Sequence, residues 1–148
     1  MEAIGLRPAT PADADFCFEL HRLAMGDYVA AIWGWNDADQ REYDERAFGP
    51  GHWQIITVDG TDAGLFIVED RPEELYLGRI ELHPDHQGQG IGGTLIRALI
   101  DRAHAQGRHV TLDVLTVNPR AYALYRRLGF QEQYRHGDGD IKIRMRCA

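Results

Sequence analysis

The chain has 148 residues, of which 44% are hydrophobic and 26% charged, a composition typical of a soluble globular domain. Its 16 basic and 23 acidic residues give a net charge of −7 without a basic cluster, which argues against a nucleic-acid partner. No apolar run approaches the roughly 20 residues of a membrane span and no signal-peptide pattern begins the chain, so we expect a cytoplasmic protein without a membrane partner.

The first part of the chain predicts a strand over residues 3–7 and then a helix that Thr10 caps. The helical spacing of its apolar residues predicts one buried face, made of Phe16, Leu20, Leu23 and Ala24. A second helix is expected from residue 36 or 37 to about 48, with Tyr43 and Phe48 in the core. Its acidic residues are expected on a solvated face, with attraction of a basic substrate as the alternative: Asp37, Asp39, Glu42, Asp44 and Glu45. Cys17, between two phenylalanines, is expected to be buried and free of a disulfide.

Strands are expected over residues 53–58 and 63–69, joined by the hairpin signal Asp59-Gly60. Another strand covers residues 74–83, and a long amphipathic helix follows over 91–106, where Gly107 ends it. A strand over 110–117, a helix over 119–128 capped by Asn118, and a hairpin over 130–135 and 141–146 complete the chain. The element order is βααβββαβαββ in a single domain, 1–148, and the fold class is α/β with helices packed on a mixed sheet.

The segment with the most functional information lies between the strand 74–83 and the long helix, and it reads Gln87-Gly88-Gln89-Gly90-Ile91-Gly92-Gly93-Thr94. Glycines let a ligand approach the backbone closely, and free N–H groups at a helix start suit a phosphate or diphosphate. The segment therefore predicts an anion site for a nucleotide-like cofactor, and a flexible glycine-rich turn is the alternative.

The spacing of Gly88, Gly90 and Gly93 also satisfies the G-x-G-x-x-G dinucleotide fingerprint. That fingerprint should follow its strand tightly near the start of a βαβ unit, whereas about half of this chain precedes it. Asp113, at the distance of a ribose-binding acid, lies inside a strand. A P-loop is excluded because no Lys precedes Thr94.

The run Gln87-Gly88-Gln89-Gly90-Ile91-Gly92 resembles the diphosphate-binding motif of the GNAT superfamily of acyl-CoA-dependent N-acetyltransferases. The later run from Asn118 to Phe130, with Ala121, Leu124-Tyr125 and Leu128-Gly129-Phe130, is similar to the superfamily's second signature. The two runs together identify the chain as a member of that superfamily.

This resemblance implies a mostly antiparallel sheet whose parallel strands 74–83 and 110–117 splay apart and receive acetyl-CoA, with helices on both faces. It assigns Tyr125 as the acid that protonates the leaving thiolate, although Tyr125 could instead be a core aromatic. No metal is expected. The expected cofactor-binding residues are Ile80, Leu82, Gln87, Gly88, Gln89, Gly90, Ile91, Gly92, Gly93, Thr94, Asn118 and Tyr125.

The base that deprotonates the acceptor ammonium is left open among Glu81, Asp113, His83 and ordered water. Trp33 and Trp35 lie in the region that borders the acceptor site in this superfamily. They are expected either to bind the acceptor or to close the core or a dimer contact.

The expected function is transfer of acetyl from acetyl-CoA to a primary amine of a small molecule or peptide. One alternative is acetylation of protein N-termini or lysines, and another is a non-catalytic acyl-CoA sensor. A third hypothesis, from a different class of enzyme, is a nicotinamide-dependent oxidoreductase. Dimers are common in this superfamily, so we expect a homodimer.

Overall fold

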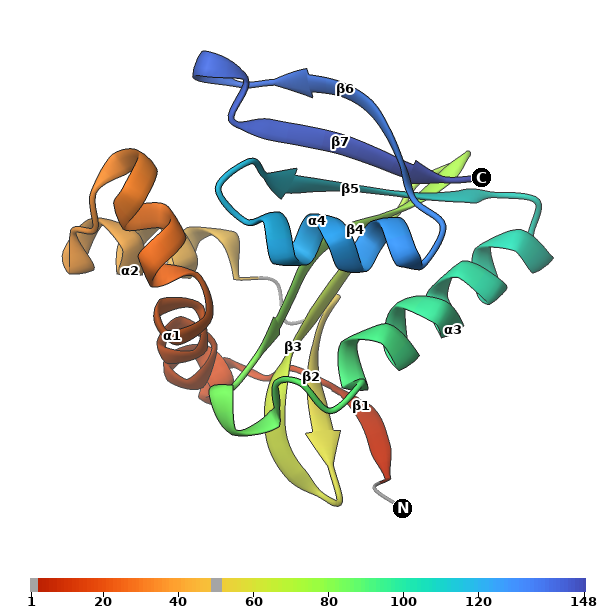
Figure 1. Ribbon diagram of the computed structural model, residues 1–148. Helices are drawn as coiled ribbons and strands as arrows, with labels where there is room; N and C mark the ends of the chain where they lie inside the picture. The colour runs from red at the N-terminus through yellow and green to blue at the C-terminus, as the bar shows by residue number, and fades with distance from the viewer. Residues whose placement is uncertain (1–2, 49–51) are drawn as a thin grey trace. The chain divides into compact units, whose positions relative to one another are not determined.

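The computed structural model describes residues 3–48 and 52–148, which form the expected order of elements (Figure 1). The strands are β1 (Ile4–Pro8), β2 (Trp53–Val58), β3 (Thr61–Asp70), β4 (Glu74–Leu82), β5 (His109–Leu115), β6 (Gln131–His136) and β7 (Lys142–Cys147). The α-helices are α1 (Ala14–Trp33), α2 (Asp37–Ala47), α3 (Ile91–Ala105) and α4 (Pro119–Arg127), and the 3-10 turns are η1 (Pro11–Asp13), η2 (Pro84–His86) and η3 (Asp138–Asp140).

Short-range signals account for several of these boundaries. The Asn36 side chain accepts a hydrogen bond from the Asp39 N–H at 3.0 Å, which satisfies a free donor at the start of α2. Asn118 caps α4 in the same way through the Ala121 N–H at 3.2 Å. Asp59 and Gly60, with φ of 51° and 82°, form the tight turn between β2 and β3. The predicted Asn118 cap and the predicted Asp59-Gly60 turn are confirmed, whereas the structure alone identifies Asn36 as the cap of α2.

Hydrogen bonding places the strands in the order β1-β2-β3-β4-β5-β7-β6. The pairs β1–β2, β2–β3, β5–β7 and β6–β7 are antiparallel, whereas β4 and β5 are parallel. The predicted mixed, mostly antiparallel sheet with a parallel central pair is confirmed.

The described residues form two compact units, one within Met1–Ile67 and Arg79–Gln89 and the other within Val68–Gly78 and Gly90–Ala148. Strand β4 contributes its first part to the second unit and its last part to the first. A single domain over residues 1–148 stays a prediction.

The first unit has an apolar core under β2 and β3. It consists of Ala9, Cys17, Leu20, Trp53, Ile55, Leu65 and Ile67, with Phe16 and Phe48 packed against it. Cys17 is a fully buried free thiol, as predicted. The predicted buried face of α1 is partly wrong, because Leu23 is 40% exposed and Phe18 is buried instead.

The prediction for α2 is wrong at two adjacent residues. Tyr43, expected in the core, is 61% exposed, and Asp44, expected in solvent, is 3% exposed. Asp44 is buried because it forms an ion pair with Arg79 of β4, with 3.0 Å between Arg79 Nη1 and Asp44 Oδ1. A buried carboxylate is stable only with such a partner, and the partner lies too far along the chain for helical periodicity to reveal it.

In the second unit, α3 buries the apolar side predicted for it, including Ile96, Leu99, Ile100 and Ala103. Parallel pairing of β4 with β5 covers four residue pairs, from Glu74↔His109 to Leu77↔Leu112. The remaining residues of β5 continue to pair with β7 as far as Leu115. None of the helices in the described ranges has the length and apolar character that a membrane span requires.

Candidate active site

The glycine segment ends in an uncapped helix start. Gly90 is the N-cap of α3 in a left-handed conformation, with φ of 81°, and Gly88 has φ of 74°. Thr94 donates the first hydrogen bond of the helix, from its N–H to the Gly90 carbonyl at 3.0 Å. The N–H groups of residues 91–93 therefore donate no hydrogen bond within the helix. Within the described residues, no side chain caps this helix start either. Free amides and the positive end of the helix dipole together favour an anion here.

Two side chains hold the segment against the end of β4. Gln87 donates from Nε2 to the Leu82 carbonyl at 2.9 Å, and Gln89 donates from Nε2 to the Asp85 carbonyl at 3.1 Å. Both glutamine side chains thus already donate to the backbone. The backbone N–H groups of the segment, more than these side chains, are free for a ligand. The Thr94 hydroxyl donates to the Gly90 carbonyl at 2.9 Å and is engaged in the same sense.

Glu81 is a buried carboxylate with both oxygens in use. Its Oε1 accepts from Arg79 Nη2 at 2.9 Å, and its Oε2 lies 2.7 Å from His21 Nδ1. Burial alone would raise the pKa of Glu81, but the charge of Arg79 and the hydrogen bond with His21 outweigh burial and hold this pKa below its usual value. An ionised carboxylate with these partners is a weak proton acceptor. Its neighbours Ile80 and Leu82 are half-buried.

Asp113 has a similar setting in the second unit. Arg144 binds it with two hydrogen bonds, of 2.8 and 3.1 Å, and His136 Nε2 lies 2.8 Å from its Oδ1. The Tyr76 hydroxyl donates to its Oδ2 at 3.2 Å. Burial favours the neutral acid, but Arg144 and His136 outweigh it, so the pKa of Asp113 is lowered. This carboxylate joins β4, β5, β6 and β7 and is also a weak base.

Tyr125 lies near the end of α4, half-buried, with its ring 5.9 Å from that of Phe130 in an edge-to-face arrangement. Burial raises the pKa of the Tyr125 hydroxyl to about 12, so the group stays protonated at neutral pH. A protonated hydroxyl can donate to a developing thiolate. Asn118, at the other end of α4, uses its side-chain oxygen for the cap described above.

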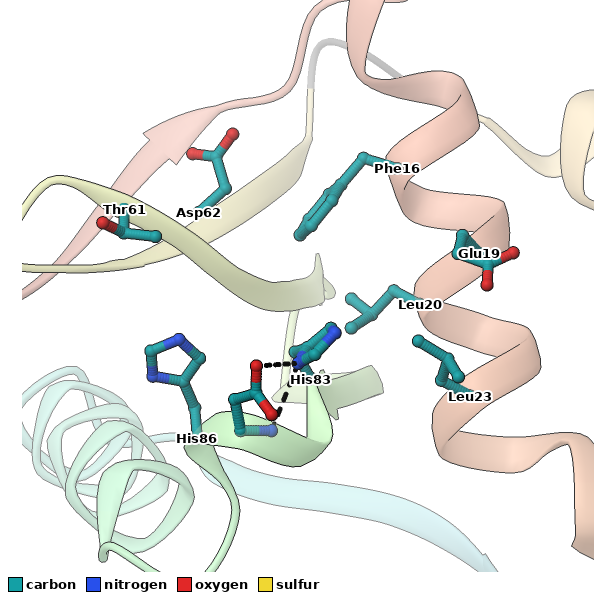
Figure 2. A pocket seen from close by; sticks show the side chains of 9 residues that line it. Phe16, Glu19, Leu20, Leu23, Thr61, Asp62, His83 and His86 are labelled. Carbon is teal, nitrogen blue, oxygen red and sulfur yellow. Dashed lines mark hydrogen bonds and ion pairs between the residues drawn. The ribbon is translucent and has the colours of Figure 1, made fainter.

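His83 lines a surface pocket of about 450 Å³ in the first unit. Figure 2 shows Phe16, Leu20 and Leu23 projecting from α1 along one side of it. The His83 Nδ1 accepts from the Asp85 N–H at 3.1 Å and so caps η2, which removes its lone pair from proton transfer. The acidic side chains of the pocket also have partners, such as Arg7 beside Asp62 at 2.9 Å, so the pocket is not a free cation site.

The two tryptophans have different surroundings. Trp33, at the end of α1, is 55% exposed, so it does not close the core. Trp35 is half-buried, with its ring 5.9 Å from the His21 ring and 6.3 Å from the Phe18 ring. Trp35 therefore borders the His21–Glu81 pair. Within residues 3–48 and 52–148, no group of three or more His, Cys, Asp or Glu side chains is arranged to hold a metal ion.

Residues 17–130 match the sequence profile of the acetyltransferase (GNAT) family, well over half of the chain. The chain belongs to this family. It is thus an acyltransferase, and the nicotinamide-dependent oxidoreductase that the glycine spacing left open is wrong.

The relatives of this GNAT protein include enzymes named for different amines. It is 33% identical over 139 residues to the L-methionine sulfoximine/L-methionine sulfone acetyltransferase of Pseudomonas paraeruginosa, covering 86% of this chain and 80% of the relative. It is 35% identical over 135 residues to the N-alpha-acetyltransferase RimI of Mycobacterium tuberculosis, covering 88% of this chain and 80% of that protein. Its fold is similar to the PaiA N-acetyltransferase of Thermoplasma acidophilum in complex with coenzyme A, with a TM-score of 0.76, 17% identity, and 97% and 98% of the two chains covered.

Sequence reasoning about this acetyltransferase missed His21, Arg79 and Asp44. One signal was available, because Arg79 and Glu81 are two residues apart on a strand and therefore share a face. The pairing with His21 was not visible, since 60 residues separate it from Glu81.

Proposed function

We propose that this acetyltransferase moves the acetyl group of acetyl-CoA to the primary amine of a small molecule or peptide, by direct attack of the amine on the thioester. The observation that carries the proposal is the uncapped start of α3 behind Gly88 and Gly90. Its amides would hold the diphosphate of coenzyme A, for which a helix N-terminus with close backbone approach is suited.

Strand β4 would hold the pantetheine arm beyond its last pair with β5, Leu77↔Leu112. The backbone around Ile80 and Leu82 would offer hydrogen bonds to the amides of the arm, with the thioester next to them. Asn118 would lie near the arm. Tyr125 would donate to the departing thiolate, in keeping with a hydroxyl whose pKa burial raises to about 12. No step in this scheme requires a metal.

The relatives support the acceptor class that we propose. A 33% identical enzyme named for methionine sulfoximine and methionine sulfone favours the α-amino group of a small amino acid derivative. The 35% identical RimI supports the second candidate, a protein or peptide N-terminus. Both acceptors present an α-amine, and Trp33 and Trp35 would form an aromatic wall for the group attached to it.

A turnover assay tests the proposal by measuring free thiol release from acetyl-CoA. The panel contains methionine sulfone, other amino acids, an N-terminal alanine peptide, polyamines, aminoglycosides and a lysine peptide. We expect thiol release above the acceptor-free rate with an amino acid derivative or the N-terminal peptide. Acetyl-CoA, and not NAD, should raise the melting temperature, because a ligand held by the native state stabilises it.

A rise in melting temperature with no thiol release from any amine would favour the acyl-CoA sensor and contradict the enzyme. Release with the lysine peptide alone would move the acceptor to protein lysines.

A further inference from the structure

A buried chain of charged side chains crosses the first unit from α2 through β4 to α1. Asp44 accepts from Arg79 at 3.0 Å, and Arg79 donates to Glu81 at 2.9 Å. Glu81 in turn lies 2.7 Å from His21 Nδ1. Asp44 and Glu81 are 3% and 4% exposed, so the network lies inside the protein and ends at the imidazole.

Such a network is a poor way to stabilise a fold. Removing two carboxylates and a guanidinium from water is costly, and their mutual attraction offsets this cost only with good geometry. Apolar side chains of similar volume often do as well. A different use for the network is to hold His21 in one orientation and one protonation pattern.

The contact with Glu81 decides which nitrogen of His21 carries the proton. An ionised carboxylate accepts only, so Nδ1–H donates to Glu81 and the lone pair of the neutral ring lies on Nε2. Among the described residues, Nε2 has no hydrogen-bond partner. Every fully buried side-chain nitrogen or oxygen there has a partner, so Nε2 must be accessible from outside. The His21 side chain is 14% exposed. A directed lone pair is thus open to a ligand.

The position of the ring connects it with the proposed site. Glu81 lies between Ile80 and Leu82, the strand segment proposed for the pantetheine arm. The centres of the His21 and Trp35 rings are 5.9 Å apart, and the Trp35 indole N–H donates to Asp37 at 3.3 Å. An amine bound against Trp35 would therefore lie close to the His21 ring beside β4.

We infer that His21 is the general base for the acceptor ammonium, with Glu81 a positioning residue that acts through it. This inference rests on the proposed function. His21 Nε2 takes one proton from the ammonium, and the neutral amine attacks the thioester carbonyl. The C–N bond forms and the C–S bond breaks. The thiolate receives a proton from Tyr125 or water, and the second proton lost by the amine nitrogen replaces it. The products are the amide and free coenzyme A, and His21 releases its proton to water.

The other candidate bases are engaged. Glu81 has both oxygens in hydrogen bonds, and His83 uses Nδ1 for the η2 cap. The charged groups that face His21 and its partner from neighbouring elements are Glu81 and Arg79 of β4 and, through Arg79, Asp44 of α2.

His21→Asn gives the sharpest test, because an Asn amide can still donate to Glu81 while no base remains. We expect kcat/KM for an alkyl-ammonium acceptor to fall by about 10²–10⁴-fold, the usual contribution of a general base. The loss should be far smaller for a hydrazide analogue of the same acceptor, whose terminal nitrogen is unprotonated at neutral pH. The KM for acetyl-CoA and its thermal shift should stay unchanged.

Three further measurements complete the test. Glu81→Gln should show the same dependence on the acceptor with a smaller loss, as expected of a positioning residue. The acidic limb of the kcat/KM pH profile, where protonation of the base lowers the rate, should disappear in His21→Asn. Added imidazole should restore part of the rate of His21→Ala. His104→Gln, at the exposed end of α3, is the matched control and should behave as the wild type.

Equal losses on both acceptors, or no loss on either, would overturn the inference. If His21→Asn fails to fold, as judged by its melting transition, absence of imidazole rescue in His21→Ala together with an unaffected Glu81→Gln would overturn it too. If the wild type releases no thiol with any amine, the failure belongs to the proposed function instead.

Discussion

Gly64 of β3 lies where the backbone of β4 comes closest to it. A Cβ at this position would be 2.4 Å from the carbonyl oxygen of Glu81 and 2.9 Å from Cδ2 of Leu82. It would also lie 3.2 Å from Cδ1 of Ile56. Ordinary van der Waals contact begins near 3.4 Å, so Gly64→Ala forces the two strands apart by about 1 Å at the residues proposed to hold the pantetheine arm.

The cost follows from which atom is in the way. Overpacking a tight site costs about 1–3 kcal/mol, and a backbone carbonyl cannot rotate aside as a side chain can. We therefore expect Gly64→Ala to lower the free energy of unfolding by about 3 kcal/mol. For a chain of this size that corresponds to a fall in melting temperature of roughly 10 °C.

Gly26→Ala is the matched control, because it makes the same chemical change in the interior of α1. No atom lies within 4 Å of a Cβ there. Alanine is a better helix former than glycine by about 0.8–1 kcal/mol, so this variant should melt roughly 3 °C higher than the wild type.

Urea unfolding and thermal melts of the three proteins measure both changes, and the KM for acetyl-CoA measures the effect on β4. We expect opposite signs for the two glycines and a raised KM for Gly64→Ala alone. A Gly64→Ala protein as stable as the wild type, with an unchanged KM, would refute the close approach of β3 to Glu81.

Tyr125→Phe should lower kcat by about 10²-fold or more and leave the acetyl-CoA thermal shift intact, whereas the exposed Tyr43→Phe should change neither. Because the pKa of Tyr125 is about 12, no loss of rate from its ionisation is expected up to pH 10. Gly90→Ala places a side chain at φ of 81°, which costs about 1–2 kcal/mol, and should raise the KM for acetyl-CoA without a matching fall in kcat. The hydrogen bonds from Arg7 lower the pKa of Asp13 to about 2, so the stability from Asp13 is fully present above about pH 4 and is lost as the pH falls toward 2. Solvent screens the partly exposed Arg7, so Asp13→Asn should cost about 1 kcal/mol at pH 7 and nothing near pH 2 in urea unfolding.

Different results would contradict each of these statements. An active Tyr125→Phe would remove Tyr125 from proton transfer. A Gly90→Ala protein with an unchanged KM would mean that the start of α3 does not bind the cofactor. A stability difference for Asp13→Asn that persists at pH 2 would show that its ion pair with Arg7 is not the cause.

The sequence predicted the elements well where the signal is local. The Asn118 cap and the Asp59-Gly60 turn each depend on residues within a few positions, and both formed as predicted. The predictions failed at Tyr43 and Asp44, where periodicity and residue type pointed the wrong way. Asp44 could be buried only because Arg79, 35 residues away, reaches it.

The sequence by itself determined the family, the order of elements and the position of the glycine segment. These features depend on adjacent residues, such as the glycines that adopt φ near 80° directly before a helix. Only the tertiary structure decided the state of the carboxylates. Glu81 and Asp113 looked alike as candidate bases, yet each is held ionised by an arginine and a histidine, and the partners of Asp113 come from other strands. The free nitrogen of His21 exists because folding brings α1 against β4, and no pattern within either element encodes that contact.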